Sequence, residues 1–240
     1  MPVKKHIPNA ITCLNLLSGC FGILLALHLN QIALAAVMIG FAALFDFFDG
    51  LAARILHVKS DIGKELDSLA DVISFGVLPG VLVYVMLTTI STNFYVPFIG
   101  FMIPVFSALR LAKFNLDTRQ TESFLGLPVQ ANAIFWAGVT LLDYTLTNNS
   151  ANLMMKQAFK QPFVIIIFTV MLSFLLVSEL PMFNLKFKNL GWAGNEIRYG
   201  FLGSAVVLTA LLGVGALPVI ILLYVLISII AKLRSNERVG

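Results

Sequence analysis

The chain has 240 residues, of which 59% are hydrophobic and only 12% are charged, and its net charge is +4. Soluble globular domains carry about 25% charged residues, so this composition excludes an ordinary soluble domain. Apolar runs along the whole chain instead predict an all-α, polytopic membrane helix bundle, with residues 1–240 forming one integral-membrane domain. The basic residues are spread along predicted helix ends, where anionic lipid headgroups lie, so we expect membrane lipids and no nucleic acid as partners.

Residues 1–8 precede the first apolar run and include Lys4, Lys5 and His6. We expect them to form a short interfacial segment, with Pro8 and Asn9 at the entry to the first helix. A secretory signal peptide is the alternative. However, no small-residue cleavage site follows the run and further apolar segments do, so a retained first span is predicted.

At about 20 residues per span, the apolar runs predict helices near 10–29, 32–56, 64–90, 94–112, 128–146 and 162–180. These six form the predicted catalytic core, over residues 9–180. The last apolar stretch, 199–233, is too long for one span and holds Gly213, Gly215 and Pro218 near its middle. Those residues suit a tight turn, which would give two short C-terminal helices and eight helices in all. A single long, tilted helix is the alternative.

The distribution of lysine and arginine predicts the orientation of these spans. With a cytoplasmic N-terminus, the outside segments hold only Lys156 and Lys160. The inside segments hold the other 14 basic residues: Lys4, Lys5, Arg54, Lys59, Lys64, Arg110, Lys113, Arg119, Lys186, Lys188, Arg198, Lys232, Arg234 and Arg238. This bias is what the positive-inside rule requires. We therefore expect a protein of the cell (inner) membrane with both termini, and the connection between the second and third helices, in the cytoplasm.

Four aspartates lie at the borders of the second and third predicted helices. Asp46 and Asp49 are three residues apart and Asp67 and Asp71 are four apart, so each pair shares one helical face. A hairpin joined near residues 57–63 would bring the two faces together. An acid near mid-bilayer costs about 2.5–3.5 kcal/mol, and mutual repulsion adds to that cost. Only Arg54 is close enough in sequence to offset it, so the cluster needs another source of positive charge.

Bound divalent cations would supply that charge. Ligand sets made only of oxygen select hard ions such as Mg²⁺, Mn²⁺ or Ca²⁺, and two such ions bridged by carboxylates can clamp a phosphoryl group for in-line transfer. Gly50 and Ala53 would leave room for a nucleotide, Gly63 would let the third helix begin close against the second, and Arg54 offers a planar fork for phosphate or a base. An ordinary satisfied acid pair and a cation transporter are the alternatives. A transporter predicts acids spread through the membrane depth on several helices.

The same stretch resembles the signature of the CDP-alcohol phosphotransferase family. It reads Asp46-x-x-Asp49-Gly50-x-x-Ala53-Arg54, then eight residues, then Gly63-x-x-x-Asp67-x-x-x-Asp71, and it matches at every fixed position. The resemblance implies transfer of a substituted phosphoryl group from a CDP-alcohol to a second alcohol, with release of CMP. It implies that Asp71 is the general base, which an alcohol nucleophile needs. It also implies two Mg²⁺ or Mn²⁺ ions on Asp46, Asp49, Asp67 and Asp71, and CDP on Asp49, Gly50, Ala53, Arg54, Gly63 and Asp67.

Further stretches resemble the bacterial and archaeal phosphatidylserine synthase branch of this family. They are 8–19, which carries a small-polar stripe with Thr12 and Asn15, 66–76, 110–115, 124–128 and part of 176–190. The resemblance implies CDP-diacylglycerol and L-serine as substrates and a homodimer. Lys113 departs from the usual RLARFN pattern. Glycerol 3-phosphate or an inositol phosphate is the alternative acceptor, and either should need an additional basic cluster near Asp71.

The stretch 110–115 supplies the candidates for binding the donor phosphates or the serine carboxylate, which are Arg110, Lys113 and Asn115. Arg110 is the strongest of the three because it lies nearest the membrane end of its helix. The alternative is that these basic residues are ordinary cytoplasmic lysines and arginines.

Overall fold

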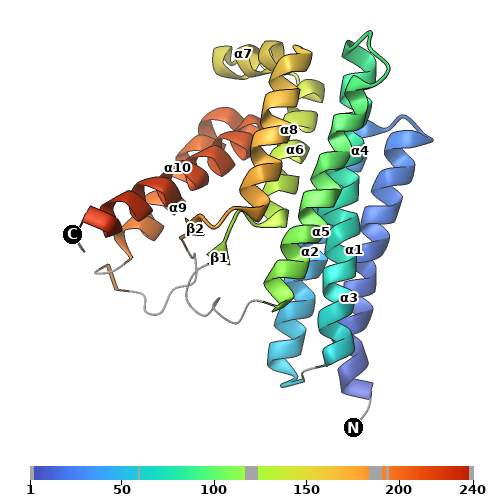
Figure 1. The fold of residues 1–240 in the computed structure, drawn as a ribbon, viewed down its shortest axis with the longest axis vertical. Coiled ribbons are helices and arrows are strands. Elements are labelled where there is room, and N and C mark those ends of the chain that lie inside the picture. The colour runs from blue at the N-terminus through green and yellow to red at the C-terminus, as the bar shows by residue number, and fades with distance from the viewer. Residues whose placement is uncertain (1–2, 59, 117–123, 184–190, 193–194, 238–240) are drawn as a thin grey trace.

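The computed structural model describes residues 3–58, 60–116, 124–183, 191–192 and 195–237. Their fold is helical, with one two-residue strand pair (Figure 1). The helices of the N-terminal half are α1 (Val3–Leu27), α2 (Ile32–Ile55), α3 (Asp61–Asp71), α4 (Leu78–Ile90) and α5 (Met102–Leu116). Those of the C-terminal half are α6 (Val129–Tyr144), α7 (Ser150–Phe159), α8 (Pro162–Val177), α9 (Glu196–Leu212) and α10 (Ala216–Glu237).

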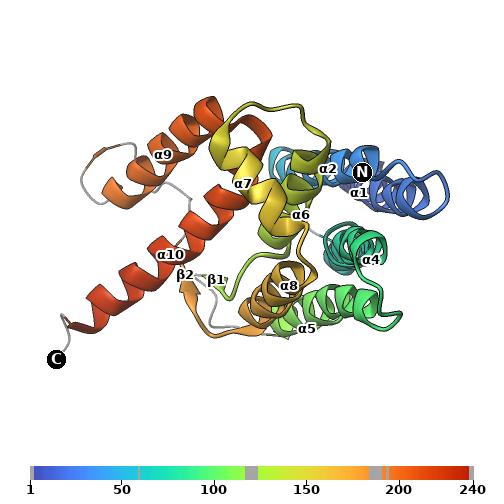
Figure 2. The ribbon, with the colours of Figure 1, turned by 90° about the horizontal axis from the view of Figure 1, so that it is seen from above.

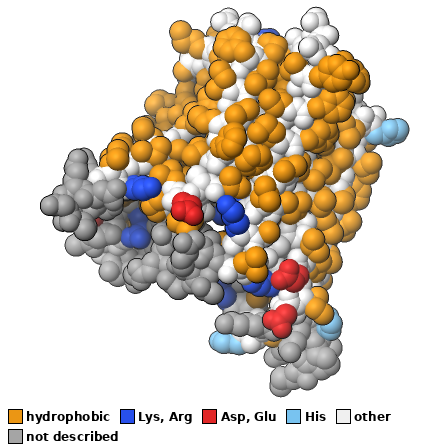
Figure 3. Space-filling view, in the orientation of Figure 1, with side chains coloured by type: hydrophobic (Ala, Val, Ile, Leu, Met, Phe, Trp, Pro, Cys, Tyr) orange, Lys and Arg blue, Asp and Glu red, His pale blue; other side chains and the backbone are white. Residues whose placement is uncertain are grey.

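Several of these helices are long and apolar enough to cross a membrane. Among the described residues there are five such stretches, or six if the bent pair α7 and α8 is one broken span. Figure 3 shows hydrophobic side chains over most of the upper part of the molecule and charged side chains mainly in its lower part. This pattern fits a belt in contact with lipid and supports an integral membrane protein.

The eight predicted helices all have counterparts in the structure, but eight membrane spans are not confirmed. α1 begins at Val3 and continues through Pro8, so there is no helix break at the predicted entry point. The structure also adds α7, which the sequence analysis did not predict. α7 turns by 88° into α8 and crosses above α6 and α8 (Figure 2). Its 10 residues are too few to span a bilayer.

The third predicted helix is a continuous helical path with an irregularity in the middle. α3 leads into a π-helical turn, η1 (Val72–Val77), which leads into α4. This turn begins directly after Asp71 and buries Ser74, Phe75 and Gly76. A π-helical turn inserts extra backbone into an α-helix and often occurs at a functional site. Here it separates the polar α3 from the buried, apolar α4.

The C-terminal apolar stretch folds into a hairpin, as its central glycines predicted. α9 ends at Leu212 and is capped by Gly213, which has φ 56° and ψ −127°, a backbone conformation that only glycine adopts readily. A short 3₁₀ turn, η3 (Gly213–Gly215), connects α9 to α10. The rings of Phe201 and Tyr224 lie 5.9 Å apart between centroids, from opposite arms of the hairpin. The alternative of one long helix is therefore wrong.

α6 forms the centre of the bundle and is packed against α2, α4 and α10. Its Phe135 and Trp136 are fully buried and meet edge to face. Just before α6, the strand β1 (Phe124–Leu125) pairs antiparallel with β2 (Pro181–Met182), which follows α8. Gly126 follows β1 with φ 74°, and a Cβ there would lie 2.5 Å from the Leu176 carbonyl oxygen. The strand pair and Gly126 therefore fix where α6 begins relative to the end of α8.

The two lysines predicted outside lie together at one end of the bundle. The N-terminus and the α2–α3 turn lie at one end, and α7 lies at the other (Figure 1). Lys156 is on α7 and Lys160 follows it, so the two lysines predicted outside are at the end opposite the α2–α3 turn. Of the basic residues predicted inside, Lys59, Arg119, Lys186, Lys188 and Arg238 lie outside the described residues. Which end faces the cytoplasm stays a prediction.

Candidate active site

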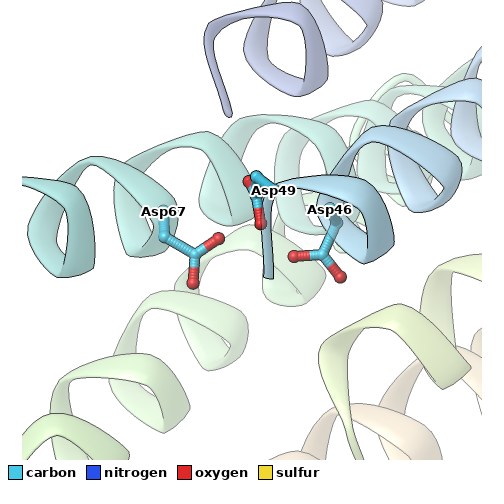
Figure 4. Close-up of side chains that lie close together, drawn as sticks. All are labelled: Asp46, Asp49 and Asp67. Atoms are coloured by element: carbon cyan, nitrogen blue, oxygen red, sulfur yellow. The ribbon is translucent and has the colours of Figure 1, made fainter. Parts of the chain in front are cut away.

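Three carboxylates from two helices converge at one place (Figure 4). Asp46 and Asp49 are on α2 and Asp67 is on α3, and one oxygen of each lies within 4.8 Å of those of the other two. We call Asp46, Asp49 and Asp67 the three-acid group. The spacing of Asp46 and Asp49 puts both on one side of α2. The predicted convergence of these acids is confirmed.

Helix α1 holds the two acid-bearing helices in place. It packs against both α2 and α3. A Cβ at Gly63 would lie 2.8 Å from Asn9 Oδ1, so the close approach that Gly63 permits is to α1. The expectation that Gly63 lets α3 begin against α2 is therefore wrong, because α1 occupies that position. The Gly63 amide also donates to Ser60 Oγ over 3.2 Å, which caps the start of α3.

The hydroxyl of Thr12 connects α1 to the three-acid group. Thr12 Oγ1 lies 2.7 Å from Asp49 Oδ2 and 3.1 Å from the Pro8 carbonyl oxygen. A hydroxyl has one hydrogen to donate, and the shorter contact is the one to the charged acceptor. Both Thr12 and Asp49 are buried. Thr12, which belongs to the small-polar stripe predicted on the first helix, therefore bonds one of the acids.

Asp71 stands beside the three-acid group but is held separately. It is the last residue of α3 and is 3% exposed. Asn15 Nδ2 on α1 donates to its Oδ1 over 3.2 Å, and Gln130 Nε2 on α6 donates to its Oδ2 over 2.9 Å. The charge of Asp71 interacts with those of Asp46 and Asp67. Two neutral amides thus fix both oxygens of the carboxylate predicted to be the general base.

A cavity of about 350 Å³ opens beside these acids. Its volume is in the range of small-molecule sites. Among the described residues, a Cβ at Gly50 would have only the Arg54 guanidinium near it, at 3.8 Å, so this wall of the cavity has room. α1 contributes Pro8, Asn9 and Thr12. The lining includes five of the six residues predicted to bind CDP: Asp49, Gly50, Ala53, Gly63 and Asp67.

The sixth predicted CDP residue, Arg54, is not among the lining residues. Its side chain is exposed, and its Nε donates to the Gly50 carbonyl oxygen of its own helix over 2.9 Å. In this conformation its guanidinium lies along α2.

Of the residues predicted to bind phosphate or carboxylate, only Arg110 is buried near the acids. It is 7% exposed, it interacts electrostatically with Asp71 and Tyr224, and its Nε has no hydrogen-bond partner among the described residues. Lys113 is exposed. Asn115 has a different environment: its Nδ2 donates to Ser68 Oγ over 2.9 Å and its carbonyl oxygen accepts from Lys64 Nζ over 3.3 Å. Asn115 therefore fastens the end of α5 to α3.

The donor set fits a hard divalent cation. Among the described residues, the side chains that donate hydrogen bonds to these acids are Thr12, Asn15 and Gln130, which carry no charge and do not neutralise them. Asp67 Oδ1 is buried and has no hydrogen-bond partner among the described residues. Carboxylate oxygens that converge in this way suit Mg²⁺ or Mn²⁺. The three-acid group could therefore hold a metal ion, with Asp71 next to it.

Gln130 is the residue that the sequence analysis missed. It follows the Leu125–Pro128 stretch and lies in the first turn of α6, 59 residues after Asp71. The available signal was a polar side chain at the start of an otherwise apolar helix. Nothing in its local sequence indicates which acid it would meet.

Comparison with known proteins agrees with this geometry. A family model described as CDP-alcohol phosphatidyltransferase matches residues 5–211. The chain is 36% identical over 190 residues to a CDP-diacylglycerol–serine O-phosphatidyltransferase of Bacillus subtilis, covering 76% of this chain and 92% of that one. It is 31% identical over 198 residues to the protein of that name from Helicobacter pylori, covering 77% of this chain and 74% of that one.

An archaeal protein shows a comparable level of similarity over a shorter region. The chain is 35% identical over 144 residues to an archaetidylserine synthase of Methanothermobacter thermautotrophicus, covering 59% of this chain and 58% of the other. The family match spans most of the chain and includes all four aspartates and the residues that contact them. The chain therefore belongs to the CDP-alcohol phosphatidyltransferase family.

Proposed function

We propose that this protein transfers the phosphatidyl group of CDP-diacylglycerol to the hydroxyl of L-serine, giving phosphatidylserine and CMP. The observation that carries the proposal is the pairing of Asp71, held by two amides, with the three-acid group beside a cavity. Serine as the acceptor is supported by the names of the bacterial relatives. The active site faces the cytoplasm in this proposal, which suits a water-soluble acceptor meeting a lipid donor.

Asp46, Asp49, Asp67 and Asp71 would hold two divalent cations, Mg²⁺ or Mn²⁺. When bound, these ions would offset the negative charge of the pyrophosphate and of the departing CMP. The cavity would take the CDP group, with Gly50 and Ala53 leaving room for it. Family membership supports this arrangement, because the four aspartates fall in the matched region.

Asp71 acts as the general base in this scheme. An alcohol is a weak nucleophile at neutral pH and needs a base within hydrogen-bond reach. The serine hydroxyl gives its proton to Asp71 while its oxygen forms a bond to the lipid-bearing phosphorus. The bond from that phosphorus to the CMP oxygen breaks, and CMP leaves with the electron pair. Asn15 and Gln130 keep the Asp71 carboxylate in one orientation throughout.

Arg110 would bind the serine carboxylate. It is buried near Asp71, and its guanidinium can form two parallel hydrogen bonds with a carboxylate. Its Nε has no hydrogen-bond partner within the described ranges, which is consistent with a ligand that arrives from outside the chain. Lys113 and Asn115 are weaker candidates, because the first is exposed and the second is already bonded to α3. A homodimer in the cell (inner) membrane completes the proposal, on the basis of the resemblance stated above.

The test is CMP release by the purified protein in detergent, with CDP-diacylglycerol and Mn²⁺ or Mg²⁺. L-serine, glycerol 3-phosphate and an inositol phosphate are supplied in separate reactions. We expect release with serine only, and a loss of about 10²- to 10⁴-fold in Asp71→Asn, the usual contribution of a general base. Release with another acceptor would keep the reaction class and overturn serine. No metal-dependent release with any acceptor would overturn the proposed chemistry.

A further inference from the structure

One buried oxygen beside Asp71 has no hydrogen-bond partner in the part of the chain that the structure describes. Asn15 on α1 is fully buried, and its Nδ2 donates to Asp71 Oδ1. Its Oδ1 is buried too and has no hydrogen-bond partner among the described residues. The two ends of this amide cannot be exchanged, because a carboxylate oxygen needs a donor and only the NH₂ group supplies one. The free end of Asn15 is therefore a hydrogen-bond acceptor.

The surrounding residues do not satisfy this oxygen. Ser74 donates its hydroxyl to the backbone carbonyl oxygen of Asn15 over 2.9 Å and not to the side chain. Gln130 is bound to the other oxygen of Asp71. A buried polar atom without a partner is unfavourable, and a bound ligand, ion or water can supply the missing bond.

We propose that Asn15 Oδ1 accepts a hydrogen bond from the ammonium group of the acceptor, so that Asn15 selects amino alcohols. This inference rests on the proposed function, in which the acceptor hydroxyl meets Asp71. Serine carries its hydroxyl and its ammonium on neighbouring carbons. A serine whose hydroxyl lies on Asp71 therefore brings its ammonium close to the amide that touches the same carboxylate.

The chemistry of the site agrees with this assignment. An amide oxygen is a neutral acceptor with no proton to lose, and an ammonium has three donors to place. The nearby acids also favour a cation over a second anion. Glycerol 3-phosphate and inositol phosphates have no ammonium and could offer Oδ1 only a neutral hydroxyl. A site built to bond a substrate N–H group rejects analogues that lack it.

The experiment compares L-serine with 3-hydroxypropionate, which keeps the hydroxyl and the carboxylate but lacks the amino group. Both are assayed by CMP release from CDP-diacylglycerol, and kcat/KM is measured for each. In the wild type we expect a strong preference for serine. Asn15→Leu, of similar size but without donor or acceptor, should reduce that preference by about 10- to 100-fold, the worth of one hydrogen bond to a charged group. The change should appear mainly as a higher KM for serine.

The ratio of kcat/KM for the two acceptors separates the role of Asn15 Oδ1 from that of Asn15 Nδ2. Loss of the Nδ2 bond to Asp71 lowers the rate with both acceptors alike, so it cancels in the ratio. Asn15→Asp retains acceptor oxygens and loses the donor, so it should lower kcat for both acceptors and keep the preference for serine. Ser18→Ala is the matched control on the same helix, because among the described residues the Ser18 hydroxyl bonds to the Leu14 carbonyl oxygen alone. It should leave the ratio unchanged.

Two results would overturn the inference in distinguishable ways. If Asn15→Leu folds and lowers both rates while the ratio stays at its wild-type value, Asn15 only positions Asp71, and the proposed function stands. If the wild type releases no CMP with serine, the proposed function fails and the inference fails with it. Should Asn15→Leu not fold, as judged by size-exclusion chromatography in detergent, a lost preference for serine in Asn15→Asp would overturn the inference instead.

Discussion

Thr12 on α1 donates a hydrogen bond to Asp49 Oδ2 on α2 over 2.7 Å, and both residues are buried. This bond spans 37 residues of sequence. It joins the first helix of the chain to the three-acid group and fixes one of the carboxylates that would hold a metal ion.

We expect Thr12→Val, which has the same shape without the hydroxyl, to weaken metal binding. A hydrogen bond to a charged group is worth about 1.5–3 kcal/mol, or roughly 10- to 100-fold in an equilibrium constant. The measurement is the Mn²⁺ concentration that gives half-maximal CMP release. Thr12→Ser keeps the hydroxyl and should behave like the wild type. A valine variant with an unchanged Mn²⁺ requirement would contradict the assigned role of this bond.

Replacement of one acid of the three-acid group should raise the melting temperature of the metal-free protein. It should also abolish the further rise in melting temperature that a divalent cation gives. Asp46, Asp49 and Asp67 have oxygens within 4.8 Å, so without a cation their charges repel one another. We expect Asp46→Asn to melt higher than the wild type in EDTA, by about 2–4 °C for each kcal/mol of repulsion removed. The rise in melting temperature that Mn²⁺ gives the wild type should be lost.

Asp143→Asn is the matched control for that experiment. Asp143 is an exposed acid of α6, near the end of the helix opposite Gln130. Its replacement should leave both the melting temperature in EDTA and the Mn²⁺ response as they are. An Asp46→Asn protein that melts lower in EDTA and still gains stability with Mn²⁺ would argue against a metal at these acids.

Gly19→Ala should damage the site through packing. A Cβ at Gly19 would lie 2.5 Å from Ser74 Oγ and 2.9 Å from Ser74 Cα, so α1 and the π-helical turn would have to move apart. Overpacking of this kind costs about 1–3 kcal/mol. We expect a lower melting temperature and slower CMP release, because the Asn15–Asp71 bond crosses the same contact. Gly40→Ala, where a Cβ meets none of the described residues within 4 Å, should be neutral or slightly stabilising.

Arg110→Lys keeps the positive charge and removes the planar fork. If Arg110 binds the serine carboxylate, the KM for serine should rise by about tenfold or more, since a bidentate contact becomes a single one. The KM for CDP-diacylglycerol should not change. Lys113→Ala removes an exposed charge from the same helix and should affect neither value by more than about twofold. A rise in the KM of the lipid substrate alone would instead assign Arg110 to the donor phosphates.

The helices and the acid cluster could be predicted because their signals are local. Apolar runs of about 20 residues report spans directly. The three- and four-residue spacings of the aspartates put each pair on one helical face before any tertiary contact is known. Gly213 and Gly215 likewise predicted the turn of the C-terminal hairpin.

The remaining features depend on distant parts of the chain. Gln130 reaches Asp71 only because α6 packs in the centre of the bundle, and no local pattern records that position. Gly63 meets Asn9 only because α1 packs against α3, which is again a contact between distant parts of the chain. α7 was missed because its ten residues carry no spanning run. The phosphate role expected for Arg54 rested on its place in the signature, which does not fix the direction of a long side chain.

The π-helical turn after Asp71 makes the number of residues in this segment as important as their identity. Such a turn corresponds to one extra residue in an α-helix, and removing a residue would let the path from α3 to α4 become regular. A one-residue deletion within 72–77 would leave the facing of Asp67 and Asp71 nearly as it is, because the wide turn absorbs its extra residue. It would instead shift the side chains of the turn itself, and with them the Ser74 hydroxyl that donates to the Asn15 carbonyl oxygen. Conservative substitutions there should be tolerated far better than any change in length, so homologous enzymes should align through this segment without gaps.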